Sequence, residues 1–112
     1  MNFDILITGA GPSGLSFARL AADAGLKIGI IEKQPEKTLA SPAYDGREIA
    51  LTHLSHQIMT DCGMWNRIAD KDISRIREAK VLNGESPYAL HFDSLEAGKP
   101  NLGFMISNHL IR

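Results

Sequence analysis

Three glycines near the N-terminus have the spacing that places a phosphate against a protein backbone. Gly9, Gly11 and Gly14 form a G-x-G-x-x-G pattern between two apolar runs. In this pattern the first glycine permits a tight turn, the second lets a pyrophosphate approach the main chain, and the third lets a helix pack closely on a strand. Pro12 suits the first position of that helix, where its missing N–H costs nothing. The free N–H groups of such a helix and its dipole attract a pyrophosphate.

An acidic residue follows at the distance that a dinucleotide site requires. Glu32 ends the second apolar run, about 20 residues after the glycine turn. A carboxylate there can accept hydrogen bonds from both hydroxyls of an adenosine ribose, and it would repel a 2′-phosphate. The residues therefore disfavour NADP, whereas NAD and FAD are equally compatible with them.

A strand–helix–strand frame is needed to position these residues. Residues 3–8 and 27–31 are short apolar runs without alternation, which is typical of strands buried on both faces of a parallel sheet. Between them, residues 15–24 repeat apolar side chains at helical spacing, and Gly25 is a natural helix stop. The order predicts an α/β fold that opens with a βαβ unit, whose crossover should be right-handed.

The remainder of the chain is predicted to mix loops, one helix and short strands. The polar segment 33–48 contains prolines and glycines and predicts a loop. From Ile49, apolar residues at steps of three and four predict a helix that Gly63 breaks or kinks. Further on, we expect additional strands near 75–92 (76–82 and 88–92, joined through 83–87), a short strand at 104–106 and a helix start at 107–108.

Two segments resemble one flavoprotein family. D-G-R-E-I-A-L at 45–51, followed by Ser55 and by G-M-W at 63–65, resembles the D-x-R-x-x-A-L…S…G-x-W stretch of aromatic-ring hydroxylases of the para-hydroxybenzoate hydroxylase type. L-G-F-M-I-S-N at 102–108 resembles their L-G-Y-x-x-x-N segment. The resemblance is closest to the ubiquinone-biosynthesis hydroxylases and covers nearly the whole chain. It implies that residues 1–112 are the N-terminal part of a Rossmann-like FAD-binding domain. Residues 75–103 would begin either a β appendage or the substrate domain.

The resemblance also implies roles for individual residues. Arg47 would reach the FAD near its pyrophosphate and flavin, and Asn108 would lie on the flavin side, where it could also serve as a simple helix cap. Asp45 would either orient Arg47 or act as a turn residue. No catalytic acid or base is expected in this segment. The predicted cofactor-binding residues are Gly9, Gly11, Pro12, Ser13, Gly14, Glu32, Lys33, Arg47 and Asn108.

The reaction that the resemblance implies is hydroxylation of an aromatic ring by an FAD-dependent monooxygenase that uses NAD(P)H and O2. The implied substrate is a small aromatic molecule, a polyprenylated ubiquinone precursor, which suggests contact with the inner membrane or with a biosynthetic complex. The family's second flavin-contacting G-D motif is not in this sequence, so we expect an N-terminal fragment that is inactive alone. Two alternatives stay open: an NAD-dependent oxidoreductase with the same fold, and a non-catalytic nucleotide-binding module.

Composition and single residues narrow the other functional classes. The formal net charge is −1, so no basic field favours nucleic acid. Cys62 is the single cysteine, which excludes an internal disulfide and fits a reducing, cytoplasmic compartment. His53 and His56 lie three residues apart but have no nearby residues that complete a ligand set, and His91 has no partner visible in the sequence. No metal site is therefore expected.

Overall fold

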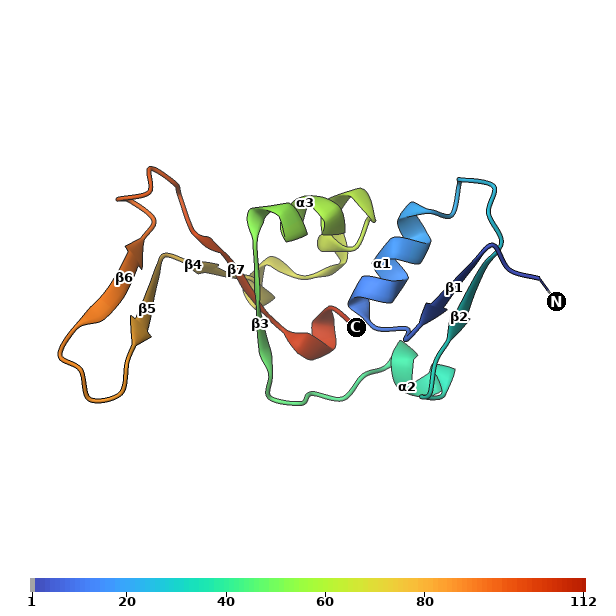
Figure 1. The fold of residues 1–112 in the computed structure, drawn as a ribbon, viewed down its shortest axis with the longest axis horizontal. Coiled ribbons are helices and arrows are strands. Elements are labelled where there is room, and N and C mark those ends of the chain that lie inside the picture. Colours follow the sequence, from blue (N-terminus) through green and yellow to red (C-terminus); the bar gives the residue numbers. More distant parts are fainter. Residues whose placement is uncertain (1) are drawn as a thin grey trace.

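The chain opens with the predicted βαβ unit. The computed structural model describes residues 2–112 and gives β1 (Ile5–Thr8), α1 (Pro12–Leu20) and β2 (Ile28–Ile31) in that order. The two strands pair in parallel, and Figure 1 shows α1 beside them. The α/β class is confirmed. Burial of both strand faces is not found, because Leu6 is 56% exposed and Ile31 is 54% exposed on a sheet of only two strands.

The first helix lies nearer the N-terminus than the predicted range 15–24. It begins at Pro12, the first helical residue, and its last residue is Leu20. The next residues form turns, in which the N–H of Ala24 donates to the carbonyl of Ala21 at 3.1 Å. Helix α2 (Glu36–Ala40) corrects the predicted loop at 33–48: Pro35 precedes it, and its carbonyl accepts the first hydrogen bonds of the turn.

The helix predicted from Ile49 is wrong in its first part. Residues Glu48–Leu51 form strand β3, and helix α3 (His53–Asp61) begins only after Thr52. Ile49 and Leu51 are the partly buried residues of this strand, in which buried and exposed side chains alternate. Leu51 fits both this alternation and the helical spacing of the residues after it, so the sequence pattern alone extended the helix back to Ile49. Two short 3₁₀ turns follow, at Trp65–Arg67 and Asp70–Asp72.

A second sheet joins segments that are far apart in sequence. Strand β7 (Gly103–Ser107) lies between β3 and β4 (Ser74–Ile76) and is antiparallel to both. At the predicted helix start, Ser107 precedes a 3₁₀ turn formed by Asn108–Leu110. Ile106 of β7 is fully buried, and it anchors a core whose other buried members are Met59, Ile68 and Ile111. Segment 102–108 is therefore held firmly beside segment 45–51.

A hairpin extends from this sheet. Strands β5 (Glu78–Leu82) and β6 (Ala89–Asp93) pair antiparallel through the predicted turn at 83–87. In Figure 1 the hairpin lies at the opposite end of the molecule from β1 and β2. The molecule is accordingly elongated, 59 × 28 × 27 Å along its principal axes. Among residues 2–112, no helix is long and apolar enough to span a bilayer.

Candidate dinucleotide site

The glycine turn has a backbone that other residues would not tolerate at two of its positions. Gly9 has φ +100°, a conformation that L side chains rarely adopt. A Cβ added at Gly14 would lie 2.3 Å from the carbonyl oxygen of Gly9 and 3.1 Å from the side chain of Ile7. Helix α1 can therefore start against the end of β1 only because position 14 is glycine, which is the packing that the spacing predicts.

The N-terminal end of α1 is open. Gly11 precedes the helix, no side chain caps it, and its first turn holds no acidic residue. A Cβ at Gly11 would meet no atom within 4 Å, so there is space in front of the backbone. Pro12 occupies the first turn and the exposed Ser13 follows. Free N–H groups at the positive end of a helix dipole, with open space before them, fit the pyrophosphate of a dinucleotide.

Glu32 closes the turn from the second strand. Its Oε2 accepts a hydrogen bond from the N–H of Ala10 at 2.7 Å, and its Oε1 accepts one from the N–H of Gln34 at 2.7 Å. These two bonds, first that of Gln34 and then that of Ala10, lower the pKa of Glu32, so the side chain is anionic. Lys33 is exposed beside it. Glu32 thus fixes the glycine turn, a structural role that its position in the sequence did not indicate.

Arg47 and Asn108 meet at one carboxylate. Arg47 donates from Nε at 2.9 Å and from Nη2 at 2.6 Å to Oδ2 of Asp45. The buried Asn108 donates from Nδ2 to the same oxygen at 2.7 Å, and its backbone N–H donates to the carbonyl of Arg47 at 2.8 Å. Both roles predicted for Asp45 are found, since it orients the Arg47 side chain and its Oδ1 accepts from the backbone N–H two residues on, as a turn residue does. The guanidinium side chain remains 62% exposed and can reach a ligand.

The charge of Asp45 is strongly stabilised by this network. The hydrogen bonds from Arg47 and from Asn108 hold the pKa of Asp45 well below its usual range. The D-x-R spacing was a local signal for the contact between Asp45 and Arg47. The two residues are close enough in sequence that Oδ1 of Asp45 also accepts from the backbone N–H of Arg47 at 3.1 Å. The bond to Asn108 spans 63 residues, so no local pattern could have predicted it.

An apolar groove of about 380 Å³ runs beside the glycine turn. Pro12 and Ser13 of α1 line it together with Ile111, three residues after Asn108. Figure 1 shows the C-terminal turn next to the start of α1, and Arg112 donates to Gln34, which follows β2 closely, at 3.2 Å. The segment that carries Asn108 therefore lies on the same side of the molecule as the glycine turn.

The remaining chemically active side chains take other partners. Nε2 of His53 lies 3.0 Å from Oδ1 of Asn101, and the ring of His56 packs edge-on against Trp65 with centroids 4.2 Å apart. Trp65 is partly buried against the core, as expected. Cys62 is a buried free thiol at the end of α3. These residues stabilise the packing of α3 and lie outside the glycine turn and the Asp45 network.

Comparison with known proteins gives both sequence and structural relatives. The ubiquinone hydroxylase UbiM of Neisseria meningitidis is 54% identical over 100% of this chain, which covers 25% of that protein. The ubiquinone hydroxylase UbiL of Rhodospirillum rubrum is 30% identical over 97% of this chain and again 25% of the relative. The chain thus spans about a quarter of the length of these relatives.

Two solved structures share the fold at lower identity. A flavoprotein/dehydrogenase from Cytophaga hutchinsonii superposes with a TM-score of 0.60 at 21% identity, over 96% of this chain and 25% of that one. The myxobacterial halogenase CndH, described as a variant of FAD-dependent halogenases, gives 0.63 at 20% identity, over 96% and 24%. Residues 2–106 match the family described as FAD binding domain. With the open helix end and the carboxylate of Glu32 in the expected places, the chain belongs to the FAD binding domain family.

Proposed function

We propose that the protein to which this chain belongs hydroxylates the aromatic ring of a ubiquinone precursor, and that this chain holds part of its FAD. The observation that carries the proposal is the similarity, over nearly the full chain, to two ubiquinone hydroxylases. No observation favours an NAD-dependent oxidoreductase or a non-catalytic nucleotide-binding module over this function.

The glycine turn would hold the adenine half of the cofactor. The N–H groups of Ser13 and Gly14 would donate to the pyrophosphate, which the open space at Gly11 admits. Each carboxylate oxygen of Glu32 keeps a free lone pair beside its backbone bond and can accept from a ribose hydroxyl. Lys33 adds a positive charge at the same edge.

The hydrogen-bonded network of Asp45, Arg47 and Asn108 would bind the flavin half of the cofactor. Arg47, held by Asp45, offers exposed N–H donors whose planar geometry matches a phosphate. Asn108, fixed between Asp45 and the carbonyl of Arg47, would lie on the flavin side. Fixing both side chains before the ligand arrives lowers the entropy that binding costs.

When bound, the flavin supplies the redox chemistry, passing two electrons from NAD(P)H to O2 so that one oxygen enters the ring and the other leaves as water. The part of this chain is to bind and orient the cofactor and to neutralise its phosphate charges.

The test uses the full-length protein purified with its cofactor. We expect a flavin absorption spectrum and NAD(P)H-dependent addition of one oxygen atom to a polyprenylated phenol, detected by mass spectrometry. Arg47→Ala should lower flavin retention, whereas Arg67→Ala, a matched exposed arginine, should not. Binding of NAD without flavin would contradict the proposal, and so would equal flavin retention in both variants.

The substrate class adds an expectation about the membrane. A polyprenyl tail partitions into lipid, so the full-length protein should associate peripherally with the inner membrane or with a biosynthetic complex. Sedimentation with vesicles that contain the polyprenylated phenol tests this. Protein that stays in the supernatant at every lipid concentration would count against membrane association.

A further inference from the structure

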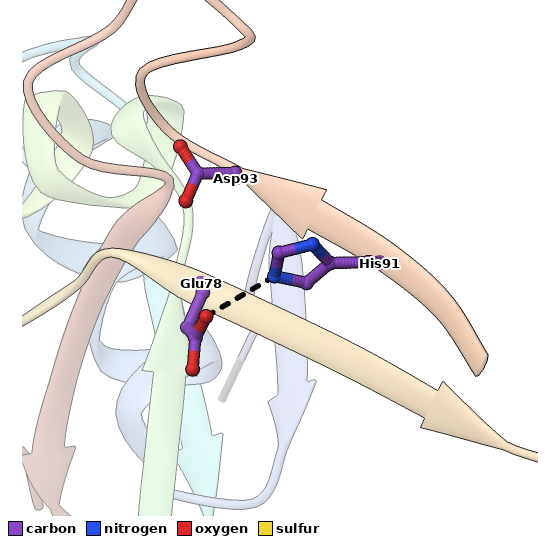
Figure 2. A group of neighbouring side chains, drawn as sticks. All are labelled: Glu78, His91 and Asp93. Carbon is purple, nitrogen blue, oxygen red and sulfur yellow. Dashed lines mark hydrogen bonds and ion pairs between the residues drawn. The ribbon is translucent and has the colours of Figure 1, made fainter.

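One face of the β5–β6 hairpin gathers three side chains that can ligate a metal. The register places Glu78 opposite Asp93, and His91 is two residues before Asp93 on the same strand. Alternate residues of a strand share a face, so the three side chains project together. Figure 2 shows them on the same side of the two strands, and their nearest ligand atoms all lie within 4.8 Å of one another.

The distance between His91 and Glu78 suits a shared ion. Nε2 of His91 lies 3.1 Å from Oε2 of Glu78, close to the spacing of two ligands around one zinc ion, since each sits about 2.0–2.2 Å from the metal. Asp93 uses Oδ1 to accept from the N–H of Leu95 at 2.7 Å, which leaves its other oxygen for a ligand bond. All three side chains are at least partly accessible to solvent.

We propose that Glu78, His91 and Asp93 bind a divalent cation of the zinc type at the base of the β5–β6 hairpin. One imidazole nitrogen with two carboxylate oxygens suits Zn²⁺, whereas Mg²⁺ and Ca²⁺ prefer oxygen ligands alone. Water completes the coordination. This site differs from the sequence-based expectation of no metal, because His91 and Glu78 are 13 residues apart and only the hairpin register brings them together.

The position of the three residues indicates what the ion does. They lie where the hairpin leaves the β3–β7–β4 sheet, next to the hydrogen bond from the N–H of Ser94 to the carbonyl of Arg77 at 2.9 Å. A two-stranded hairpin is marginally stable by itself, and this one is exposed over most of its length. An ion that ligates both strands fixes the base of the hairpin and with it the direction in which the hairpin projects.

Lys80 is the natural competitor of the ion. Its Nζ lies 3.7 Å from Oε1 of Glu78, and it faces His91 across the strands. A fixed positive charge beside a cation site weakens binding through Coulomb repulsion. Removing the Lys80 charge should therefore tighten metal binding, while removing any one of the three ligands should weaken it. A surface ion-pair cluster without a metal function predicts neither effect.

The test is a calorimetric titration of the full-length protein with Zn²⁺ after chelator treatment. We expect one ion per chain, with the imidazole nitrogen signals of His91 shifted in the NMR spectrum. His91→Gln should abolish binding. Glu78→Gln and Asp93→Asn should each weaken it by at least about tenfold, since even outer-shell partners of metals contribute that much. Asparagine can still accept from Leu95, so Asp93→Asn keeps the turn.

Controls separate this site from other zinc-binding groups. His53→Gln removes a histidine on α3 and should leave the titration unchanged, and Lys80→Gln should tighten binding several-fold. Mg²⁺ in excess should not displace Zn²⁺. The proposal is overturned if the wild-type chain binds no Zn²⁺, if His91→Gln keeps the same affinity and stoichiometry, or if Lys80→Gln leaves the affinity unchanged.

Discussion

Asp45 is the residue at which two distant segments of the site meet, so its charge should be visible in the stability of the protein. Asp45→Asn keeps the shape but weakens the bonds from Arg47 and Asn108. Because folding lowers the pKa of Asp45, its stabilising contribution is fully present above the unfolded value of about 3.9 and is lost as the pH falls through the folded value.

The predicted measurement is the difference in melting temperature between wild type and Asp45→Asn as a function of pH. The wild type should be more stable at neutral pH, and its advantage should shrink below about pH 4. Taking the difference cancels the titration of Glu32, whose pKa is also lowered. A difference that stays constant down to the acid transition would show that the Asp45 carboxylate does not carry the network.

Substitutions at Gly14 and Gly11 test two different roles of glycine, close packing of α1 at Gly14 and access of the ligand to the backbone at Gly11. Gly14→Ala places a Cβ 2.3 Å from a backbone oxygen, so it should cost about 1–3 kcal/mol of unfolding free energy. Gly11→Ala meets no atom within 4 Å and should fold with nearly wild-type stability but bind FAD more weakly. Urea unfolding and a flavin titration measure the two effects. Equal destabilisation by both substitutions would refute the assignment.

At the scale of elements, the start of α3 depends on one side chain. Thr52 precedes the helix, and its hydroxyl accepts from the N–H of Ser55 at 3.1 Å. Thr52→Ala leaves that N–H without a partner and should lower the unfolding free energy by about 1 kcal/mol. Ser55→Ala is the control for the backbone bond, since it removes the contact between the Ser55 and Thr52 hydroxyls at 3.1 Å but keeps the N–H that donates to Thr52. If chemical denaturation gives the two variants the same stability, the cap does not stabilise α3.

The elements also show which predictions the sequence can support. The βαβ unit and the β5–β6 hairpin were predictable because each combines apolar runs with glycine-containing turns inside a short stretch of chain. Strand β3 was not, since Ile49 and Leu51 fit a helix as well as a strand until β7 is known to pair with them. Local periodicity cannot report a partner strand that lies more than 50 residues away.

The candidate site also has one part that the sequence predicts and one part that only the fold reveals. The glycine turn and Glu32 follow from spacing alone, because a βαβ unit fixes where both must lie. Joining Arg47 to Asn108 through Asp45 depends on the pairing of β3 with β7, where Glu48 lies opposite Ser107. The resemblance named Arg47 and Asn108 separately, and the sheet explains why they lie together.

At the scale of the whole molecule, apolar surface is the main feature. Among residues 2–112 the core cluster has four buried members, whereas large apolar side chains remain exposed on β1, on β6 and in the turn after β6, for example Leu6 at 56%, Leu90 at 60% and Leu95 at 83%. A chain that buries so little apolar surface gains little from the hydrophobic effect. Since the relatives are about four times longer, the stability of this segment should depend on the rest of the protein.

We therefore predict that residues 1–112 produced alone bind the dye ANS, unfold over a broad temperature range and do not hydroxylate a phenol when FAD and NAD(P)H are added. Exposed apolar surface with loose packing gives these signatures. The full-length protein, measured in parallel, should show little dye binding and a sharp transition. If residues 1–112 alone gave a sharp transition without dye binding, the core around Ile106 would be sufficient to fold them cooperatively. If they hydroxylated the phenol, the cofactor site would be complete within these residues.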